Sequence, residues 1–420
     1  MYEVSRLKSG LTVASAEMPH MASVSLGLWV GVGGRYEPAP LNGVSHFIEH
    51  LLFKGTRKRS AKEISQAVEG IGGYLNAFTG EESTCFYSKG RHDRLEALLE
   101  VLMDMFLHSR FARGEIDKER DVIKEELAMY LDQPQHHVHE LLNELLWPEH
   151  PLGRSLTGTE KTLDALRRPQ LVEYQRRNYV AASTLVIVAG NLRHEKVVQA
   201  VSQFESQFAC GQRPQFLPVR EQQTQTRVRL FTKNTAQTQL ALGIRACSRH
   251  DERRYALRLL NTLLGENMSS RLFQVVREDH GLAYSISSSL GLFDDVGTLT
   301  ISAGLDTGKL PQAVRLINRE LRRFIEEPPS AKELRDARDY LIGQIDLSLE
   351  STENQMMWLG DQLIGYGKII RPAQIKERLG EVTAGQIRAV GREFLRPERM
   401  SLALVSPLKS ADRLARTLKA

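Results

Sequence analysis

A run of five residues, from His46 to His50 with the sequence HFIEH, holds two histidines and one glutamate. If this run is helical, His46, Glu49 and His50 lie on one stripe, because residues three and four positions apart are neighbours on a helix surface. The flanking residues are mostly apolar, which indicates that the helix is buried. Burying three ionisable groups together costs several kcal/mol unless something compensates them. Two neutral imidazoles one helical turn apart can share a zinc ion and leave the carboxylate beside it, so the run predicts a zinc site.

The order of these residues narrows the chemistry. The pattern H-x-x-E-H is the inverted form of the common zinc-protease pattern H-E-x-x-H, and it is itself a zinc-protease pattern. The competing interpretation is a pair of core histidines hydrogen-bonded to a carboxylate without any metal. Because a chance match is rare in a chain with 12 histidines, the pattern favours a zinc-dependent peptidase.

A catalytic zinc site needs a third protein ligand and an open position for water, and the segment from Glu115 to Leu131 offers a ligand. It has helical periodicity with one apolar stripe, which comprises Ile116, Val122, Ile123, Leu127 and Tyr130. Glu119 and Glu126 interrupt this stripe, whereas Glu125 falls on the polar face. A carboxylate on a buried stripe needs a partner, so we predict Glu126 as the third ligand and Glu119 as the residue that orients a ligand histidine. The alternative is that both glutamates only pair with nearby lysine or arginine side chains.

The elements that would position these residues recur in the second half of the chain. Four pairs of similar segments keep nearly one offset: 24–30 with 240–246, 95–106 with 310–324, 115–118 with 333–336, and 183–188 with 400–405. Strand patterns precede paired helices in each half and return near its end. We therefore expect an α+β fold of two homologous tandem domains, each a mainly antiparallel sheet with helices packed on one side.

The boundary between the two domains is predicted from composition. Pro214 and Pro218 flank a polar, glutamine-rich run. We expect a zinc-bearing domain over residues 1–209, a linker over 210–226 and a homologous domain without metal ligands over 227–420.

At this point a family resemblance can be stated. The run from His46 to His50, followed by Glu126 within the segment 119–126, resembles the pitrilysin or insulinase family of metallopeptidases. The likeness is closer to its short-chain branch, which contains the mitochondrial processing peptidase subunits and their bacterial relatives. Segments 72–79, 268–273 and 277–284 also match, so the resemblance covers essentially the whole chain.

The resemblance implies a role for each motif residue. His46, His50 and Glu126 would bind one zinc ion per chain, and Glu49 would be the general base. The second half would have lost the metal, and there Gln344 stands near the position to which Glu126 maps.

The resemblance also implies how substrate is bound. The segment 74–79 has a strand pattern, and Asn76, Ala77 and Phe78 match the family's substrate-binding edge strand. Arg277 and Tyr284 match a catalytic Arg and Tyr that reach the substrate from the second half of a clamshell in double-length relatives. The expected function is therefore a zinc metalloendopeptidase that cleaves extended peptides or unfolded segments.

A chain of this length would supply only half of such a clamshell, so two chains must meet. We expect a homodimer whose chamber is shared. Two alternatives stay open: a catalytic subunit paired with a zinc-less homologue, and a non-catalytic scaffold subunit. Cleavage preference and the physiological substrate also stay open at this stage.

The overall composition excludes several other classes of protein. Hydrophobic and charged fractions of 41% and 25% are typical of a globular chain, and a net charge of +5 with interleaved signs predicts no nucleic-acid partner. No stretch reaches transmembrane length, so no membrane partner is expected. The 3 cysteines show no paired spacing, which indicates a reducing, cytoplasmic compartment.

Overall fold

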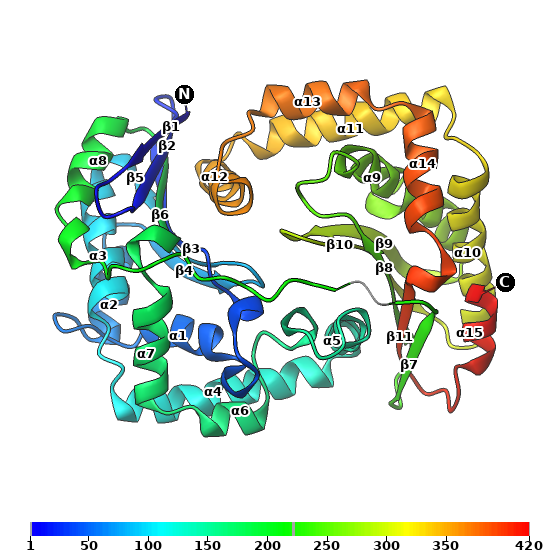
Figure 1. Ribbon diagram of the computed structural model, residues 1–420, viewed down its shortest axis with the longest axis horizontal. Helices are drawn as coiled ribbons and strands as arrows, with labels where there is room; N and C mark the ends of the chain where they lie inside the picture. Colours follow the sequence, from blue (N-terminus) through cyan, green and yellow to red (C-terminus); the bar gives the residue numbers. More distant parts are fainter. Residues whose placement is uncertain (1, 221–222, 420) are drawn as a thin grey trace. The chain divides into compact units, whose positions relative to one another are not determined.

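The computed structural model describes residues 2–220 and 223–419 of the 420-residue chain. They form two compact units, each built around one sheet (Figure 1). Unit 1 consists of Met1–Ala128, Arg154–Leu217 and Leu347–Ile369, and unit 2 consists of Met129–Gly153, Pro218–Asp346 and Ile370–Ala420. The predicted α+β class with two tandem repeats is confirmed.

The sheet of unit 1 has six strands in the order β1-β2-β6-β3-β5-β4. Their bounds are β1 Tyr2–Arg6, β2 Thr12–Glu17, β3 Ser23–Val30, β4 Tyr74–Thr79, β5 Thr84–Arg91 and β6 Thr184–Gly190. Only the β2–β6 pair is parallel. Strand β4 is an edge strand, and its register places Ala77 opposite Phe86 of β5.

Helices cover both faces of this sheet. Apart from α5, which packs in unit 2, the helices of the first half are α1 Val44–Leu52, α2 Ala61–Glu69, α3 Leu95–His108, α4 Arg113–Asp132, α6 Glu160–Ala165, α7 Arg168–Asn178 and α8 His194–Ser202. Apolar side chains of α1, α3 and α7 form the main core with one face of the sheet. The other face, around Trp29 and Cys85, packs against Met356, Leu359 and Leu363 of α12 (Thr352–Tyr366). Figure 1 shows α12 on the opposite side of the sheet from α3 and α8.

The sheet of unit 2 repeats this arrangement with five strands in the order β7-β11-β8-β10-β9. Their bounds are β7 Arg227–Thr232, β8 Thr238–Ala246, β9 Ala283–Leu292, β10 Gly297–Leu305 and β11 Met400–Ser406. The run β6-β3-β5-β4 of unit 1 corresponds to β11-β8-β10-β9 here, so the repeat predicted from the sequence is also a repeat of sheet position. In this sheet β9 is the edge strand that corresponds to β4.

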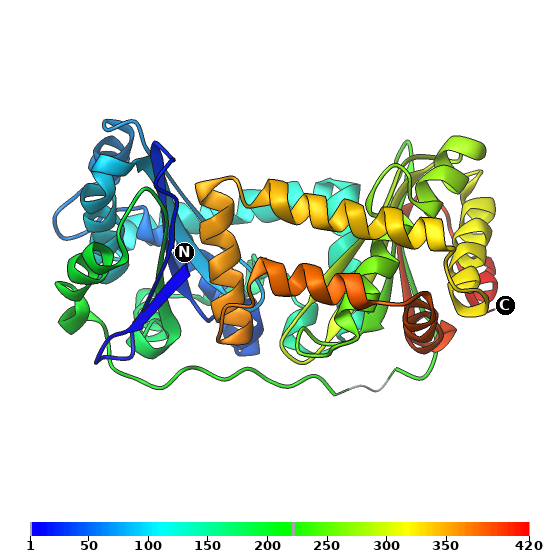
Figure 2. The ribbon, with the colours of Figure 1, turned by 90° about the horizontal axis from the view of Figure 1, so that it is seen from above.

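The helices of unit 2 are likewise on both faces. Apart from α12, which packs in unit 1, those of the second half are α9 Arg254–Asn261, α10 Leu310–Glu326, α11 Ala331–Ser348, α13 Pro372–Glu381, α14 Ala384–Phe394 and α15 Asp412–Lys419. Helix α13 runs beside α11, where Lys376 pairs with Asp346 (Figure 2). The opposite face of the sheet packs against α5 (Pro134–Leu146), a helix from the first half of the chain.

The two repeats therefore exchange one helix each. Helix α5 follows α4 in the first half and packs in unit 2, while α12 follows α11 in the second half and packs in unit 1. The predicted domains, 1–209 and 227–420, describe the repeats in the sequence, whereas the compact units cross them. The predicted linker, 210–226, contains the change from unit 1 to unit 2 between Leu217 and Pro218. A helix on the second face of each sheet is an addition to the fold expected from the sequence.

Candidate metal centre and active site

Helix α1 carries the predicted zinc motif and begins at a tightly packed glycine. Gly43 has a φ of 91°, a conformation that favours glycine, and a Cβ atom there would lie 2.7 Å from the carbonyl oxygen of Thr157. Phe47, Ile48 and Leu51 are fully or almost fully buried, as the apolar pattern predicted. The start and the depth of the motif helix are thus set by close packing.

Glu37 holds the N-terminus of α1. Its Oε2 accepts a hydrogen bond from the backbone N–H of Gly43 at 2.7 Å, and its Oε1 accepts one from the N–H of Ser45 at 2.8 Å. Asn42 Nδ2 donates a third at 3.2 Å. The side chain is buried, and burial raises the pKa of Glu37 to about 7, against the lowering effect of these hydrogen bonds. The sequence did not predict this residue, because Glu37 lies outside the local capping positions of α1, which begins at Val44 with Gly43 as its N-cap.

The three predicted ligands converge within unit 1. His46 and His50 extend from α1, and their Nε2 atoms lie 3.8 and 3.6 Å from Oε2 of Glu126 on α4. Within the described part of the chain, this trio is the only set of three or more His, Cys, Asp or Glu residues whose ligand atoms lie within 4.8 Å of one another. No comparable group is found in the described residues of unit 2, where Gln344 lies on α11.

The donor set fits a zinc ion. A tetrahedral zinc with ligand bonds of about 2.0–2.1 Å keeps its ligand atoms about 3.3–3.4 Å apart, close to the observed separations. Burial, together with the neighbouring His50, lowers the pKa of His46 to about 4, so this imidazole is neutral at physiological pH, as a metal ligand must be. Two imidazoles and one carboxylate also leave one position open for water.

Glu119 orients the second histidine. Its Oε2 lies 3.1 Å from Nδ1 of His50, and its Oε1 pairs with Nζ of Lys54 at 2.8 Å. With Nδ1 donating to Glu119, Nε2 is the nitrogen that faces Glu126 and that is left to bind a metal. Burial lowers the pKa of His50, but hydrogen bonds to Glu126 and Glu119 outweigh it and the pKa is raised.

The burial of α4 differs from the predicted stripe at one position. Ile116, Glu119, Ile123 and Leu127 are buried, but Val122 is 49% exposed. Because Val122 directly precedes Ile123, it lies about 100° around the helix from that residue, beyond the edge of the buried stripe. Glu125 is exposed and Glu126 is half-buried, which is the difference on which the choice of ligand depended.

Glu49 lies beside the ligand trio and at the end of the edge strand. Its Oε2 accepts a hydrogen bond of 2.5 Å from Oγ1 of Thr79, the last residue of β4. Burial raises the pKa of Glu49, against the lowering effects of Thr79 and His50. A carboxylate with a raised pKa is suited to accept and return a proton near neutral pH. The sequence did not single out Thr79, because nothing local links it to Glu49.

The predicted substrate strand is open on one side. Asn76 is exposed and Ala77 and Phe78 are half-buried on β4, and Phe78 packs edge-on against Trp29 with 5.4 Å between ring centroids. Strand β4 pairs only with β5 among the described strands, so its outer edge has no strand partner, although the N–H of Ala77 donates to Oδ1 of Asn76 at 2.8 Å. An extended peptide can add to such an edge.

Arg277 and Tyr284 lie in unit 2, whereas the predicted zinc ligands lie in unit 1. Arg277 is exposed in a π-helical turn (Phe273–Asp279), with its guanidinium 4.7 Å from the centroid of the Phe273 ring. Tyr284 is 78% exposed at a β-bulge near the start of β9, where the register with β10 passes from Ser285 to Ala283. A bulge turns a side chain out of the regular alternation of its strand.

Comparisons with known proteins agree with the fold and the motif. A family model described as Insulinase (Peptidase family M16) matches residues 12–160, and one described as Peptidase M16 inactive domain matches residues 165–341. The chain is 36% identical over 418 residues to an uncharacterized zinc protease of Mycobacterium leprae, covering 98% of this chain and 93% of that protein. It is 37% identical over 405 residues to an uncharacterized zinc protease of Bacillus subtilis, covering 95% and 97%.

Solved structures share the fold. A protease from Helicobacter pylori superposes with a TM-score of 0.91 at 21% identity, covering 97% of this chain and 99% of that one. A Pseudomonas fluorescens structure described as a peptidase M16 inactive domain gives 0.90 at 19% identity, with the same coverage. The chain therefore belongs to peptidase family M16, the insulinase family, as the resemblance of its motifs predicted. Among the described residues, we find no helix with the length and apolar character needed to span a bilayer.

Proposed function

We propose that the chain is a zinc metalloendopeptidase that hydrolyses peptide bonds in extended peptides or unfolded segments. One observation carries the proposal: the imidazoles of His46 and His50 and the carboxylate of Glu126 converge, with Glu49 beside them and the open edge of β4 adjoining. The names of the relatives, which are zinc proteases, support the same metal and reaction class.

The residues divide the chemistry among them. His46, His50 and Glu126 would hold a zinc ion, which would supply Lewis acidity and lower the pKa of a water molecule. Glu49 removes a proton from the attacking water and returns it to the leaving amine. The hydrogen bond from Thr79 to Oε2 fixes the orientation of this carboxylate and leaves its other oxygen, Oε1, without that contact. Glu119 holds His50 in the tautomer and orientation that ligation needs.

The edge strand aligns the substrate for this chemistry. Main-chain hydrogen bonds from Asn76 to Phe78 would bind a peptide as an added strand, which favours extended segments and tolerates many side chains. Thr79 at the end of the same strand contacts Glu49, so a peptide paired with β4 is led toward the general base.

The proposed active site also includes Arg277 and Tyr284 of a second chain. Both side chains are exposed in unit 2, as groups that meet a substrate must be. We infer a homodimer in which each chain supplies these two residues to its partner's site, where they stabilise the developing oxyanion. A heterodimer with a zinc-less homologue is the second candidate assembly. The three free cysteines, Cys85, Cys210 and Cys247, favour a reducing, cytoplasmic location.

The test uses the full chain expressed alone. We expect one zinc per chain by atomic absorption and cleavage of unstructured members of a peptide library. The matched variant Glu49→Gln should keep its zinc and lose cleavage, because only the proton acceptor is changed. Cleavage that survives this substitution, or a purified chain that binds no zinc, would contradict the proposed function.

A further inference from the structure

Four arginines line one open pocket of unit 2. The pocket has a volume of about 510 Å³ and lies along α14 and the turn that follows it. Its lining consists of Gly385, Arg388, Ala389, Arg392, Glu393, Arg396 and Arg399. None of these residues belongs to the proposed active site, which lies in unit 1.

Three of the arginines are oriented in the same way. Nε of Arg388 and Nε of Arg392 donate to the carbonyl oxygen of Ile325 at 3.3 and 3.1 Å, and Nε of Arg396 donates to the carbonyl of Arg392 at 3.1 Å. A guanidinium has five N–H donors, and the Nε bond uses one of them. Within the described residues, the terminal nitrogens of these three side chains make no hydrogen bond, so each guanidinium is held in place with four donors to spare.

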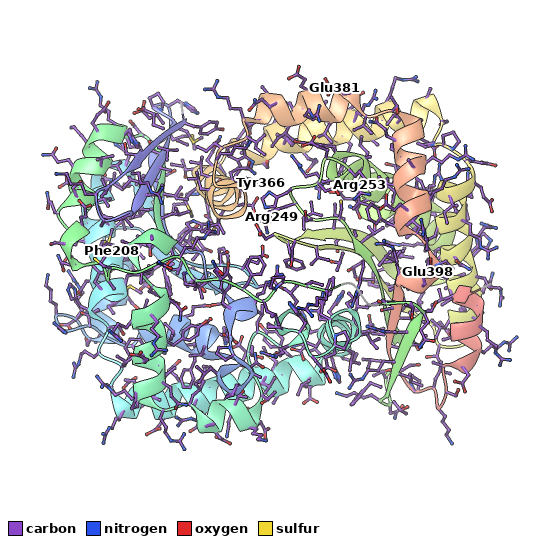
Figure 3. The ribbon with its side chains drawn as sticks, viewed as in Figure 1. Phe208, Arg249, Arg253, Tyr366, Glu381 and Glu398 are labelled. Carbon is purple, nitrogen blue, oxygen red and sulfur yellow. The ribbon has the colours of Figure 1, made fainter. Side chains whose placement is uncertain are left out.

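The positive charge of three of these arginines, Arg388, Arg392 and Arg396, is not neutralised by neighbouring carboxylates in the described part of the chain. Glu393 is the only acidic residue in the lining, and it pairs with Arg253, the residue just before α9 that is labelled in Figure 3. No carboxylate of the described chain lies within ion-pair distance of Arg388, Arg392 or Arg396. Like charges fixed side by side repel one another, and an anion in the pocket would relieve that repulsion.

A purely structural role accounts for only part of this arrangement. Arg388 and Arg392 cap the carbonyl of Ile325 near the C-terminal end of α10, a position that favours cations. One N–H from one arginine would satisfy that role. It explains neither Arg396 and Arg399 nor the pocket that all four share.

The spacing of the arginines indicates the class of ligand. Arg388 and Arg392 are one helical turn apart, about 6 Å along the axis, and Arg396 follows just beyond the end of α14. A guanidinium group binds two oxygens of a phosphate through two parallel N–H bonds. One phosphate group is too small to bind all of these arginines at once. We propose that this pocket binds an anion with two or more adjacent phosphate groups, either an inorganic oligophosphate or the phosphate chain of a nucleotide.

The test is calorimetric titration of the zinc-loaded full chain at low ionic strength with tripolyphosphate, ATP and orthophosphate. We expect one tripolyphosphate per chain, with orthophosphate at least tenfold weaker. The double variant Arg388→Gln/Arg392→Gln should bind tripolyphosphate at least tenfold more weakly. The control Arg335→Gln, an exposed arginine of α11 outside the pocket, should bind like the wild type. Equal binding of ATP would identify a nucleotide as the source, and much weaker binding of ATP would identify the inorganic chain; both results support the site.

Two results would overturn the proposal. One is equal tripolyphosphate affinity in the double variant and in the Arg335→Gln control. Equal affinity would mean that the measured heat comes from removal of zinc by tripolyphosphate, which would be the same in both variants. The other is orthophosphate binding as tightly as tripolyphosphate. If the double variant does not fold, as judged by its thermal midpoint, Arg396→Gln gives the same decision, because among the described residues the side chain of Arg396 bonds only to the carbonyl of Arg392 in its own segment.

Discussion

Glu125 and Glu126 are adjacent carboxylates with opposite surroundings. Glu126 points at two imidazoles from a half-buried position, and Glu125 is exposed to solvent, about 100° around α4 from it. We expect Glu126→Gln to weaken zinc binding by more than about 100-fold, because a neutral amide replaces the one anionic ligand. The matched control Glu125→Gln should bind zinc like the wild type. Competition with a fluorescent zinc chelator measures both affinities, and equal losses in the two variants would refute the ligand assignment.

The sequence was informative at this scale wherever a side chain's role depends on its own helix. Periodicity alone placed His46, His50 and Glu126 on buried stripes, and the structure brings them together. Two kinds of feature were not predicted. One is a contact between residues that are distant in sequence, and the other is local backbone geometry that no sequence pattern marks. Thr79 reaches Glu49 across 30 positions, and the bulge that exposes Tyr284 leaves no mark in the composition of its strand.

At the scale of the element, α1 depends on the carboxylate that holds its first turn. The folded-state pKa of Glu37 is about 7, above the value of 4.5 expected when the chain is unfolded. Glu37 therefore keeps its proton to a higher pH in the folded chain than in the unfolded chain. Its contribution to the free energy of unfolding is complete below pH 4.5 and is lost as the pH rises to 7. We expect the free energy of unfolding of the wild type, relative to Glu37→Gln, to fall by about 3 kcal/mol across this window.

Urea unfolding of both chains at pH 5, 6, 7 and 8, with metal removed, measures this difference. Subtracting the Glu37→Gln values removes the contribution of groups that titrate in both chains. A difference that does not change with pH, or one that grows as the pH rises, would show that Glu37 is ionised in the folded chain throughout.

Helix α12 packs on its sheet through a glycine. A Cβ atom at Gly360 would lie 2.2 Å from Cε2 of Trp29, a ring atom buried on β3. We expect Gly360→Ala to destabilise the chain by about 1–3 kcal/mol, as overpacking of a core does. The control Gly343→Ala, within α11, meets no atom within 4 Å and should stabilise it by about 0.5–1 kcal/mol through helix propensity. Thermal midpoints that move the same way in both variants would contradict the packing described for α12.

The exchange of helices explains what the sequence could not predict about the units. The apolar stripe of α12 shows that it is buried on a sheet, and that of α5 shows the same. Neither stripe tells which of two similar sheets it covers, because the repeats share their strand patterns and sheet order. A contiguous domain was therefore the simplest expectation, and only the contacts around Trp29 and Ala241 show the exchange.

At the scale of the whole molecule, the proposed homodimer predicts complementation between two inactive chains. Glu49→Gln removes the proton acceptor in unit 1, and Tyr284→Phe removes the hydroxyl from the exposed bulge in unit 2. If each site draws on both chains, a mixed dimer has one site with both residues intact and one site with neither. Random pairing puts both variants in about half of the dimers, so about one quarter of wild-type activity should return on mixing.

The measurement is peptide cleavage by an equimolar mixture, after subunits have been allowed to exchange, beside each variant alone. The mass of the wild-type chain in solution is the control, because complementation needs a dimer. A dimer without recovered activity would place Glu49 and Tyr284 of the same chain at one site, and a Tyr284→Phe chain that is active alone would leave Tyr284 outside the chemistry. An inactive wild-type monomer that gains activity on adding a zinc-less homologue would instead support the heterodimer, since the missing arginine and tyrosine would then come from a different chain.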